Sequence, residues 1–297
     1  MAEKRLPILQ GEYKLLQVME TLEDSKIYKS QSVVHSERLF AIREFKLEGY
    51  EAPEKRAVVS AYFQPIALGY MDFVSPSLTS LRNFFIENGH IYFVFDYIPG
   101  RRLSKCLRER HRPFTENEAL DIAYKIAVAL DELHSCSPIK FMADVCLGNV
   151  ILITNGNVAL TDFGLGKLLL QLPEEAPRMG TVGYAAPEQY GREGIVSRAT
   201  DIYGLGVIMH QLVSGIDPTV QEGRMPLISE VNPAISEEYI KIVRTATRTD
   251  ATKRFYSASD MAGAIRSIMP KRGRSNKSVK GDTWGDLLKM IKKPFVG

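Results

Sequence analysis

The chain has 297 residues, of which 45 % are hydrophobic and 25 % charged, a composition typical of a soluble globular protein with material for a sizeable core. Its formal net charge of +3 is too small to indicate a nucleic-acid-binding protein, so no nucleic-acid partner is predicted. The three cysteines are scattered and form no C-x-x-C pair, which supports neither a zinc site nor a disulfide framework and favours a cytoplasmic location. No apolar run is long enough to span a membrane, and the N-terminus lacks the apolar core of a secretory signal.

Three strands are predicted over residues 13–19, 26–34 and 38–45, where β-branched and aromatic residues alternate with polar ones. The turn between the first two strands, residues 20–25, reads ETLEDS and contains three carboxylates and no glycine. A carboxylate about 4 Å from a phosphate charge repels it by about 1 kcal/mol even in water. A turn that binds phosphate usually contains glycines, which let backbone N–H groups approach the phosphate closely. Without glycines and with three carboxylates, this turn is predicted to be solvated and not to hold a phosphate group.

A helix is predicted next, over residues 54–71. Pro65 lies in its interior and is expected to break or kink it, because proline removes one backbone hydrogen bond and crowds the preceding turn. Two further strands, residues 80–87 and 90–97, flank Asn88-Gly89, which is a hairpin signal.

The pattern becomes helical from Leu103, and the strongest helix is predicted over residues 116–136. Thr115 and Glu118 have the spacing of a capping box at its start. His134 lies at its end, where a structural role is expected through contacts with the last carbonyl groups of the helix.

A second hairpin is predicted where two apolar runs, residues 150–153 and 158–161, flank a turn that contains Asn155-Gly156. Polar motifs surround this hairpin in a fixed order: Asp144, Asn149 five residues on, Asp162-Phe163-Gly164 directly after it, and later Ala186-Pro187-Glu188. Each motif alone is a weak signal, but the order and the spacing together are specific.

This arrangement resembles the catalytic core of protein kinases, in particular the bacterial Ser/Thr kinases, over about residues 12–268. The resemblance implies an α+β, two-lobed kinase fold. Residues 1–98 would form the small, β-rich N-lobe, residues 99–270 the larger helical C-lobe, and residues 271–297 a basic linker with a short amphipathic helix.

The resemblance also implies roles for individual residues. Asp144 would orient a substrate hydroxyl, while Asn149 and Asp162 would bind the Mg²⁺ ions that bridge the phosphates of ATP. Asp96 and Ile98 would lie in the hinge, where backbone groups contact adenine. Two scaffold contacts are implied as well: Asp201 with the backbone of the catalytic loop, and Arg254 with Glu188.

The phosphate side of the implied site departs from the family. The three positions that carry glycines in the family are Glu20, Leu22 and Ser25 here. Arg43 stands where the family has the lysine that contacts the phosphates, and a planar guanidinium is not equivalent to an ammonium group. Lys46 lies three residues further on and faces the other side of an extended strand, so it would replace that lysine only with a bulge.

Other catalytic positions depart too. Gln64 and Pro65 stand where the helix glutamate that pairs with the strand lysine is expected, and Glu54 and Glu51 are only distant alternatives. In the implied catalytic loop, residues 142–149, Ala143 replaces the arginine that would pair with a phosphate in the activation loop. Cys146 replaces the lysine that neutralises the transferring phosphoryl group. It is interpreted as a small space-filler, with a reactive thiol as the alternative.

We predict from these departures a pseudokinase with impaired or absent phosphotransfer that acts as a regulatory or scaffolding module and retains ATP and Mg²⁺ as weak ligands at most. An active but divergent Ser/Thr kinase, with Arg43 or Lys46 serving the phosphates, is the second hypothesis. The third is an interaction protein whose nucleotide site is filled by Leu168–Leu170.

A protein partner is expected to bind either the activation segment, between Gly164 and Tyr184, or the C-terminal tail. The tail has an apolar stripe at helical spacing, made by Trp284, Leu287, Leu288 and Ile291. Three placements of this stripe are open: its own lobe, the groove of a partner protein, or an anionic membrane surface.

Overall fold

The computed structural model describes residues 6–21, 25–46, 52–71, 75–135, 141–161, 180–190, 194–220 and 225–270. The predicted activation segment before residue 180 and the C-terminal tail therefore lie outside the described residues. The chain divides into two compact units with a boundary between Ile98 and Pro99.

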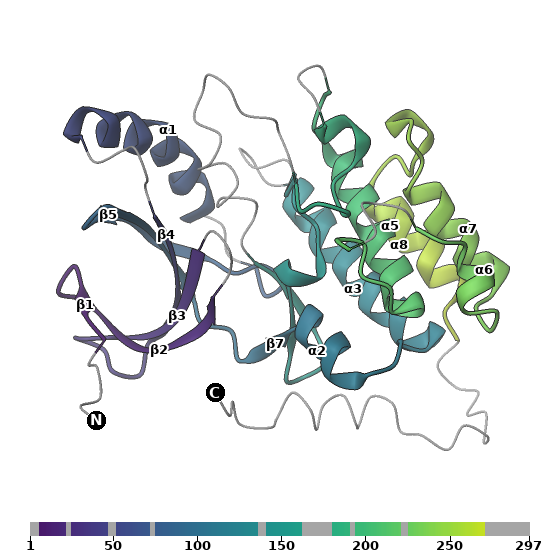
Figure 1. Ribbon diagram of the computed structural model, residues 1–297, viewed down its shortest axis with the longest axis horizontal. Coiled ribbons are helices and arrows are strands. Elements are labelled where there is room, and N and C mark those ends of the chain that lie inside the picture. Colours follow the sequence, from purple (N-terminus) through teal and green to yellow (C-terminus); the bar gives the residue numbers. More distant parts are fainter. Residues whose placement is uncertain are drawn as a thin grey trace. The chain divides into compact units, whose positions relative to one another are not determined.

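The N-terminal unit contains a six-stranded antiparallel sheet in the order β1-β2-β3-β4-β6-β5 (Figure 1). The five strands predicted from the sequence are confirmed, and a short additional strand, β1, pairs with the first of them. The strands are β1 Ile8–Leu9, β2 Tyr13–Thr21, β3 Ser25–Ser32, β4 Leu39–Lys46, β5 Leu81–Glu87 and β6 His90–Asp96.

One face of this sheet carries an aromatic and aliphatic core that includes Tyr28, Ile42 and Tyr92. The carboxylate of Glu44 lies among them and accepts hydrogen bonds from the hydroxyl groups of Tyr28 at 2.8 Å and Tyr92 at 2.9 Å. Burial, followed by the contact with Glu44, raises the pKa of both phenols, so both remain protonated donors. Glu44 is tolerated at this position because its oxygens have partners.

The register of β4 decides which face each of its side chains occupies. Arg43 pairs with Ile27 of β3 and Phe93 of β6, and the pairing with β6 continues without a bulge to Lys46. Because side chains alternate along a strand, Arg43 and Lys46 lie on opposite faces. The bulge that Lys46 would need to replace Arg43 is absent from this described strand.

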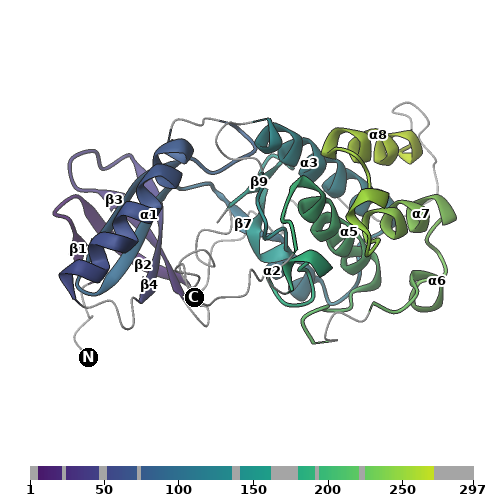
Figure 2. The ribbon, with the colours of Figure 1, turned by 90° about the horizontal axis from the view of Figure 1, so that it is seen from above.

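Helix α1, Pro53–Met71, packs beside β5 (Figures 1 and 2). Of the two predicted effects of Pro65, a break or a kink, the break is wrong, because the helix continues through that position to Met71. Proline removes one backbone hydrogen bond, while the bonds of the neighbouring turns and the packing of the helix on β5 remain.

Replacing Pro65 with Ala is expected to raise the free energy of unfolding by about 2 kcal/mol. An interior proline costs a helix about 3 kcal/mol, and proline recovers at most about 1 kcal/mol by stiffening the unfolded chain. The measurement is urea unfolding of both proteins. Pro53→Ala is the matched control, since Pro53 occupies the first helical position, where proline is tolerated. An equal gain in both variants would contradict the argument.

The C-terminal unit combines a three-stranded sheet, β7-β8-β9, with a set of helices. The predicted second hairpin is confirmed as β8 and β9. The strands are β7 Gly100–Arg102, β8 Val150–Ile153 and β9 Val158–Leu160, and the helices are α2 Leu103–Arg110, α3 Glu116–His134, α5 Arg198–Ser214, α6 Ile228–Val231, α7 Glu237–Ala246 and α8 Ala258–Ile268.

Helix α3 is the centre of this unit and packs against α5 and α8 (Figure 1). Its predicted apolar face is buried, and the predicted capping box is present: the Thr115 hydroxyl accepts the Glu118 N–H, and the Glu118 carboxylate accepts the Thr115 N–H. Among the described helices, none has both the length and the apolar character to cross a membrane.

Candidate active site

Asp144 and Asn149 are brought together by the loop that leads from residue 141 into β8. The Asn149 side-chain Nδ2 donates to the backbone oxygen of Asp144 at 3.0 Å and to its Oδ2 at 3.1 Å. Both residues are buried. A single turn of 3₁₀-helix, Leu147–Asn149, lies between Asp144 and β8, and the Asn149 amide at its end donates back to the Asp144 carboxylate. The predicted proximity of these two site residues is thus a feature of the structure.

The other oxygen of the Asp144 carboxylate faces the segment that follows residue 179. The backbone N–H of Thr181 donates to Asp144 Oδ1 at 2.7 Å, and the Thr181 hydroxyl donates to Cys146 Sγ at 3.6 Å. This short segment therefore lies directly on the catalytic loop, and Thr181 contacts it through both its main chain and its side chain.

Cys146 is a buried, neutral thiol. Burial, followed by the nearby Asp144 charge, raises the pKa of its thiol to about 12. Because the thiolate is the reactive form, this environment favours the space-filling interpretation over the reactive thiol. The thiol also offers no positive charge at the position where the family carries a lysine.

Asp201 holds the backbone of the catalytic loop, as the resemblance implied. Its carboxylate accepts the N–H of Met142 at 2.6 Å and the N–H of Ala143 at 2.7 Å. The same carboxylate contacts His134 Nε2 at 2.8 Å, and both side chains are buried. The prediction that His134 contacts the last carbonyls of its own helix therefore named the wrong partner. Sequence spacing could not reveal a contact between residues that lie far apart in the chain.

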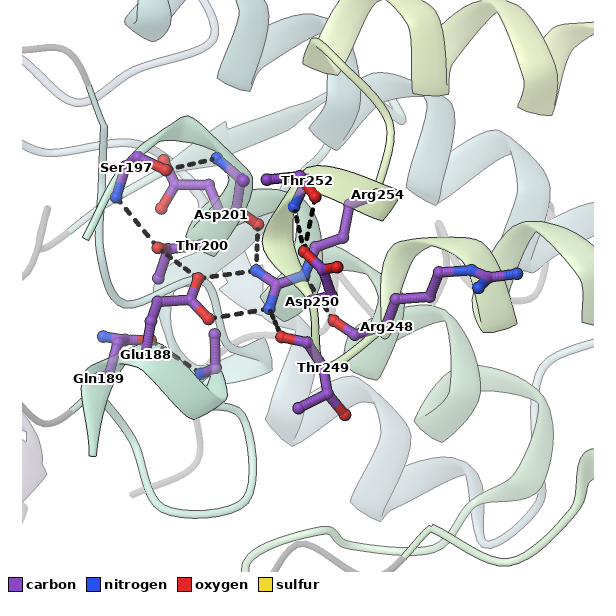
Figure 3. A network of polar contacts seen from close by, with 12 residues as sticks. Glu188, Gln189, Ser197, Thr200, Asp201, Arg248, Thr249, Asp250, Thr252 and Arg254 are labelled. Atoms are coloured by element: carbon purple, nitrogen blue, oxygen red, sulfur yellow. Dashed lines mark hydrogen bonds and ion pairs between the residues drawn. The ribbon is translucent and has the colours of Figure 1, made fainter. Parts of the chain in front are cut away.

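Glu188 and Arg254 form the predicted ion pair, and Figure 3 shows its surroundings. The guanidinium donates to both carboxylate oxygens, from Nη1 at 2.7 Å and from Nη2 at 2.8 Å. Thr200 donates its hydroxyl to Glu188 at 2.8 Å, and the Arg254 guanidinium lies 4.9 Å from the centre of the Tyr203 ring. This network ties the start of α5 to the segment after α7.

Arg43, in the other unit, contacts Ser25 and Phe45 among its described neighbours. Its Nε donates to the hydroxyl of Ser25 at 3.2 Å, and its guanidinium lies 4.7 Å from the centre of the Phe45 ring. Ser25 occupies one of the three positions that carry glycine in the family. Both positions are conspicuous in the sequence, but their contact was not predicted, since only the pairing of β3 with β4 brings them together.

Asp96, at the end of β6, forms a two-pronged ion pair with Arg82, whose Nε lies 2.9 Å from each carboxylate oxygen. Its backbone N–H donates to Ser80 O, and the N–H of Tyr97 donates to Leu39 O. Ile98 belongs to the same unit. The two expected hinge residues, Asp96 and Ile98, thus share a unit with Arg43, while Asp144 and Asn149 belong to the other.

Asp162, the second expected Mg²⁺ ligand, lies outside the described residues together with Phe163 and Gly164. Within the described part of the chain, no group of three or more His, Cys, Asp or Glu side chains is placed to bind a metal ion. The expected ligand pair is therefore represented in the structure by Asn149 alone.

Comparison with known proteins agrees with this geometry. The family model described as the protein kinase domain matches residues 24–272. The chain is 31 % identical over 193 residues to the serine/threonine-protein kinase PknA of Corynebacterium glutamicum. This match covers 61 % of this chain and 40 % of that protein. It is 24 % identical over 281 residues to the probable kinase PknB of Lactococcus lactis, covering 90 % of this chain and 44 % of that protein. The chain thus spans less than half the length of these relatives.

The fold has a solved counterpart in the crystal structure of the Mycobacterium tuberculosis PknI kinase domain. The TM-score is 0.69 with 19 % sequence identity, and the match covers 90 % of this chain and 99 % of that one. A β-sheet unit followed by a helical unit, the anchored Asp144–Asn149 loop and the matching family model lead to one conclusion: the chain belongs to the protein kinase family and has the protein kinase fold.

Proposed function

We propose that this chain is a pseudokinase, a kinase-fold protein with impaired or absent phosphotransfer that acts as a regulatory or scaffolding module. The observation that carries the proposal is Cys146. A buried thiol with a pKa of about 12 is neutral at physiological pH, and it stands where a lysine would neutralise the transferring phosphoryl group. Losing one such preorganised group typically costs about 10²–10³ in rate.

The N-terminal unit supports the proposal independently. Arg43 donates to Ser25, and its guanidinium lies over the Phe45 ring, so neighbours on its own strands help to orient it. Lys46 lies on the opposite face of β4 and is not placed to act in its stead. Kinase catalysis consists almost entirely of positioning and charge stabilisation, so defects at two cationic positions reduce it severely.

Members of the protein kinase family generally use ATP and Mg²⁺, and the proposal retains them as weak ligands. The amide nitrogen of Asn149 is the donor to Asp144, which leaves the amide oxygen as the kind of ligand atom that Mg²⁺ prefers. Asp162 would supply the second oxygen ligand. The bound ion would neutralise part of the phosphate charge.

The test is a phosphotransfer assay with labelled ATP and Mg²⁺, comparing the wild-type chain with the variant Asp144→Ala. The proposal predicts that the two proteins incorporate the same background level of phosphate into themselves and into a generic acceptor protein. Robust transfer by the wild-type chain that Asp144→Ala abolishes would overturn it.

A second candidate function, an active but divergent Ser/Thr kinase, is favoured by the intact pair of Asp144 and Asn149. It predicts transfer that Asp162→Asn abolishes. Thermal unfolding with ATP or ADP, each with and without Mg²⁺, separates nucleotide binding from transfer. A ligand at 100 times its Kd stabilises the native state by about 2.7 kcal/mol. No increase in Tm at millimolar nucleotide would favour the third hypothesis, an interaction protein with a filled nucleotide site.

As a module, the chain would act through a protein partner. Two segments are proposed for that contact: the activation segment with Leu168–Leu170, and the C-terminal tail with its apolar stripe. For the tail, contact with an anionic membrane surface is the alternative.

A further inference from the structure

The residue directly before Asp144 has an unfavourable backbone conformation. Ala143 has a φ of 61°, in the left-handed region that residues with a side chain rarely adopt. Such a conformation persists only where surrounding contacts enforce it. The contacts around Ala143 therefore determine where the Asp144 carboxylate lies.

Two buried side chains hold the two polar groups of Ala143. Asp201 Oδ1 accepts its N–H at 2.7 Å, and Gln189 Nε2 donates to its carbonyl oxygen at 2.7 Å. The Gln189 side chain is 4 % exposed, and its Oε1 accepts the N–H of Ala186 at 2.9 Å. Because one end of the amide must donate and the other must accept, both contacts depend on glutamine rather than on its shape alone. Figure 3 shows Gln189 beside Glu188.

Gly180 packs directly against this contact. A Cβ atom at Gly180 would lie 2.9 Å from Gln189 Nε2 and 3.1 Å from the carbonyl oxygen of Ala143, so the chain passes directly against both. The next residue, Thr181, donates its N–H to Asp144. One amide side chain thus joins the catalytic loop, the Thr181 segment and the turn at Ala186.

We propose that Gln189 is a positioning residue that holds Ala143 in its left-handed conformation and thereby fixes Asp144 against Thr181, without the help of a phosphorylated residue. In the family, an arginine at the position of Ala143 pairs with a phosphate of the activation loop, and this chain lacks that cation. A neutral internal amide takes over the ordering. The proposal concerns the geometry of the loop and holds whether or not the chain transfers phosphate.

The variant Gln189→Glu tests the donor alone, since it keeps the size of the side chain and the acceptor toward Ala186. The introduced carboxyl group cannot donate to the carbonyl of Ala143 when it is ionised, whereas it can when it is protonated. Burial raises the pKa of such a carboxyl group above its usual value of about 4.3. The restored contact is therefore present at low pH and lost as the pH rises through the raised pKa.

The measurement is native-state hydrogen exchange of the Thr181 amide in the full, unphosphorylated chain, relative to core amides of α5. In Gln189→Glu, we expect the Thr181 amide to exchange at least ~10-fold faster than in wild type at about pH 8, relative to the core amides. At about pH 5 this relative exchange rate should approach the wild-type value. A tenfold change corresponds to about one hydrogen bond. Gln189→Leu, which can never donate, should exchange fast at both pH values. A pH-independent ratio for Gln189→Glu, or an unprotected Thr181 amide in the unphosphorylated wild-type chain, would overturn the proposal.

Ala143→Gly provides a second, independent test, which remains valid if Gln189→Glu fails to fold. Glycine adopts a positive φ without strain, so this variant should raise Tm and keep the Thr181 amide protected. It should also reduce the effect of Gln189→Glu when the two substitutions are combined. A Tm that does not rise would show that the strain at Ala143 is no larger than the extra chain entropy that glycine loses on folding, too small to require a positioning residue, and the proposal would be wrong.

Discussion

Replacing Arg254 with Met is expected to lower the free energy of unfolding by about 3–5 kcal/mol, because the substitution leaves the Glu188 carboxylate as a largely buried charge without its partner. The Arg254 side chain has no exposed surface, and that of Glu188 is 12 % exposed. Arg254 also donates to the carbonyl oxygens of Arg248 at 2.7 Å and Ala199 at 2.9 Å, which would lose a charged donor. Equilibrium denaturation measures the change.

The chain offers a matched control in Arg82→Met. Arg82 also binds a carboxylate with two prongs, that of Asp96, but the two side chains are 42 % and 40 % exposed. Exposed ion pairs contribute about 0–1 kcal/mol, so this variant should unfold almost like wild type. Equal losses of unfolding free energy in Arg254→Met and Arg82→Met would show that burial does not determine the contribution of the Glu188–Arg254 pair.

The buried ion pair of Glu188 and Arg254 should also make the free energy of unfolding depend on pH. Burial alone would raise the pKa of Glu188, but hydrogen bonds from Arg254, from the backbone and from Thr200 outweigh it and lower the pKa below its ordinary value. A lowered pKa means that this contribution to stability is complete above the unfolded-state pKa and is lost as the pH falls through the folded-state pKa. Glu188→Gln should remove this acid-dependent part of the unfolding free energy.

Replacing Asp201 with Asn is the second substitution with a large expected effect, a loss of about 2–4 kcal/mol. Asp201 is fully buried and accepts three hydrogen bonds, from Met142, Ala143 and His134. Hydrogen bonds to a charged group contribute about 1.5–3 kcal/mol each, and an asparagine amide would turn donor hydrogens toward at least one of these donors. The loss should appear in urea unfolding and as faster exchange of the Ala143 amide.

Asp217→Asn serves as the control for this substitution. Asp217 also accepts a backbone N–H, that of Thr219 at 2.9 Å, but it lies in an exposed loop. Water can satisfy the groups that this variant leaves unpaired, so a loss below about 1 kcal/mol is expected. If Asp201→Asn cost no more than Asp217→Asn, the carboxylate would not be what holds the catalytic loop.

Much of this fold could be predicted because local patterns and tertiary structure agree. Alternation marks β2 to β6, Asn-Gly turns mark both hairpins, and the capping box at Thr115 marks the start of α3. Pro65 is the exception, since a local rule on helix breaking was overridden by the packing of α1 against the sheet. The positions of Asp144 and Asn149 followed from short-range spacing in one loop.

The parts of the site that sequence reasoning missed depend on contacts between distant residues. The pairing of β3 with β4 brings Ser25 to Arg43, and the packing of α3 against α5 brings Asp201 to His134. Gln189 carried no signal of its own, because its partner is the carbonyl of Ala143, whose left-handed backbone the sequence does not encode locally. Such contacts appear only once the helices and strands are assembled.

The two buried cysteines of the described C-terminal unit can report local opening of the structure through the rate at which they are labelled. Burial raises the pKa of Cys106 to about 11 and that of Cys146 to about 12, so neither sulfur reacts with an alkylating reagent while its surroundings are closed. In a Cys136→Ser background, the labelling rate of Cys146 would count excursions of the catalytic loop, and that of Cys106 those of α2. A partner that binds the catalytic loop and holds it closed would slow the labelling of Cys146 and leave that of Cys106 unchanged. Such a partner could be detected without any enzymatic activity.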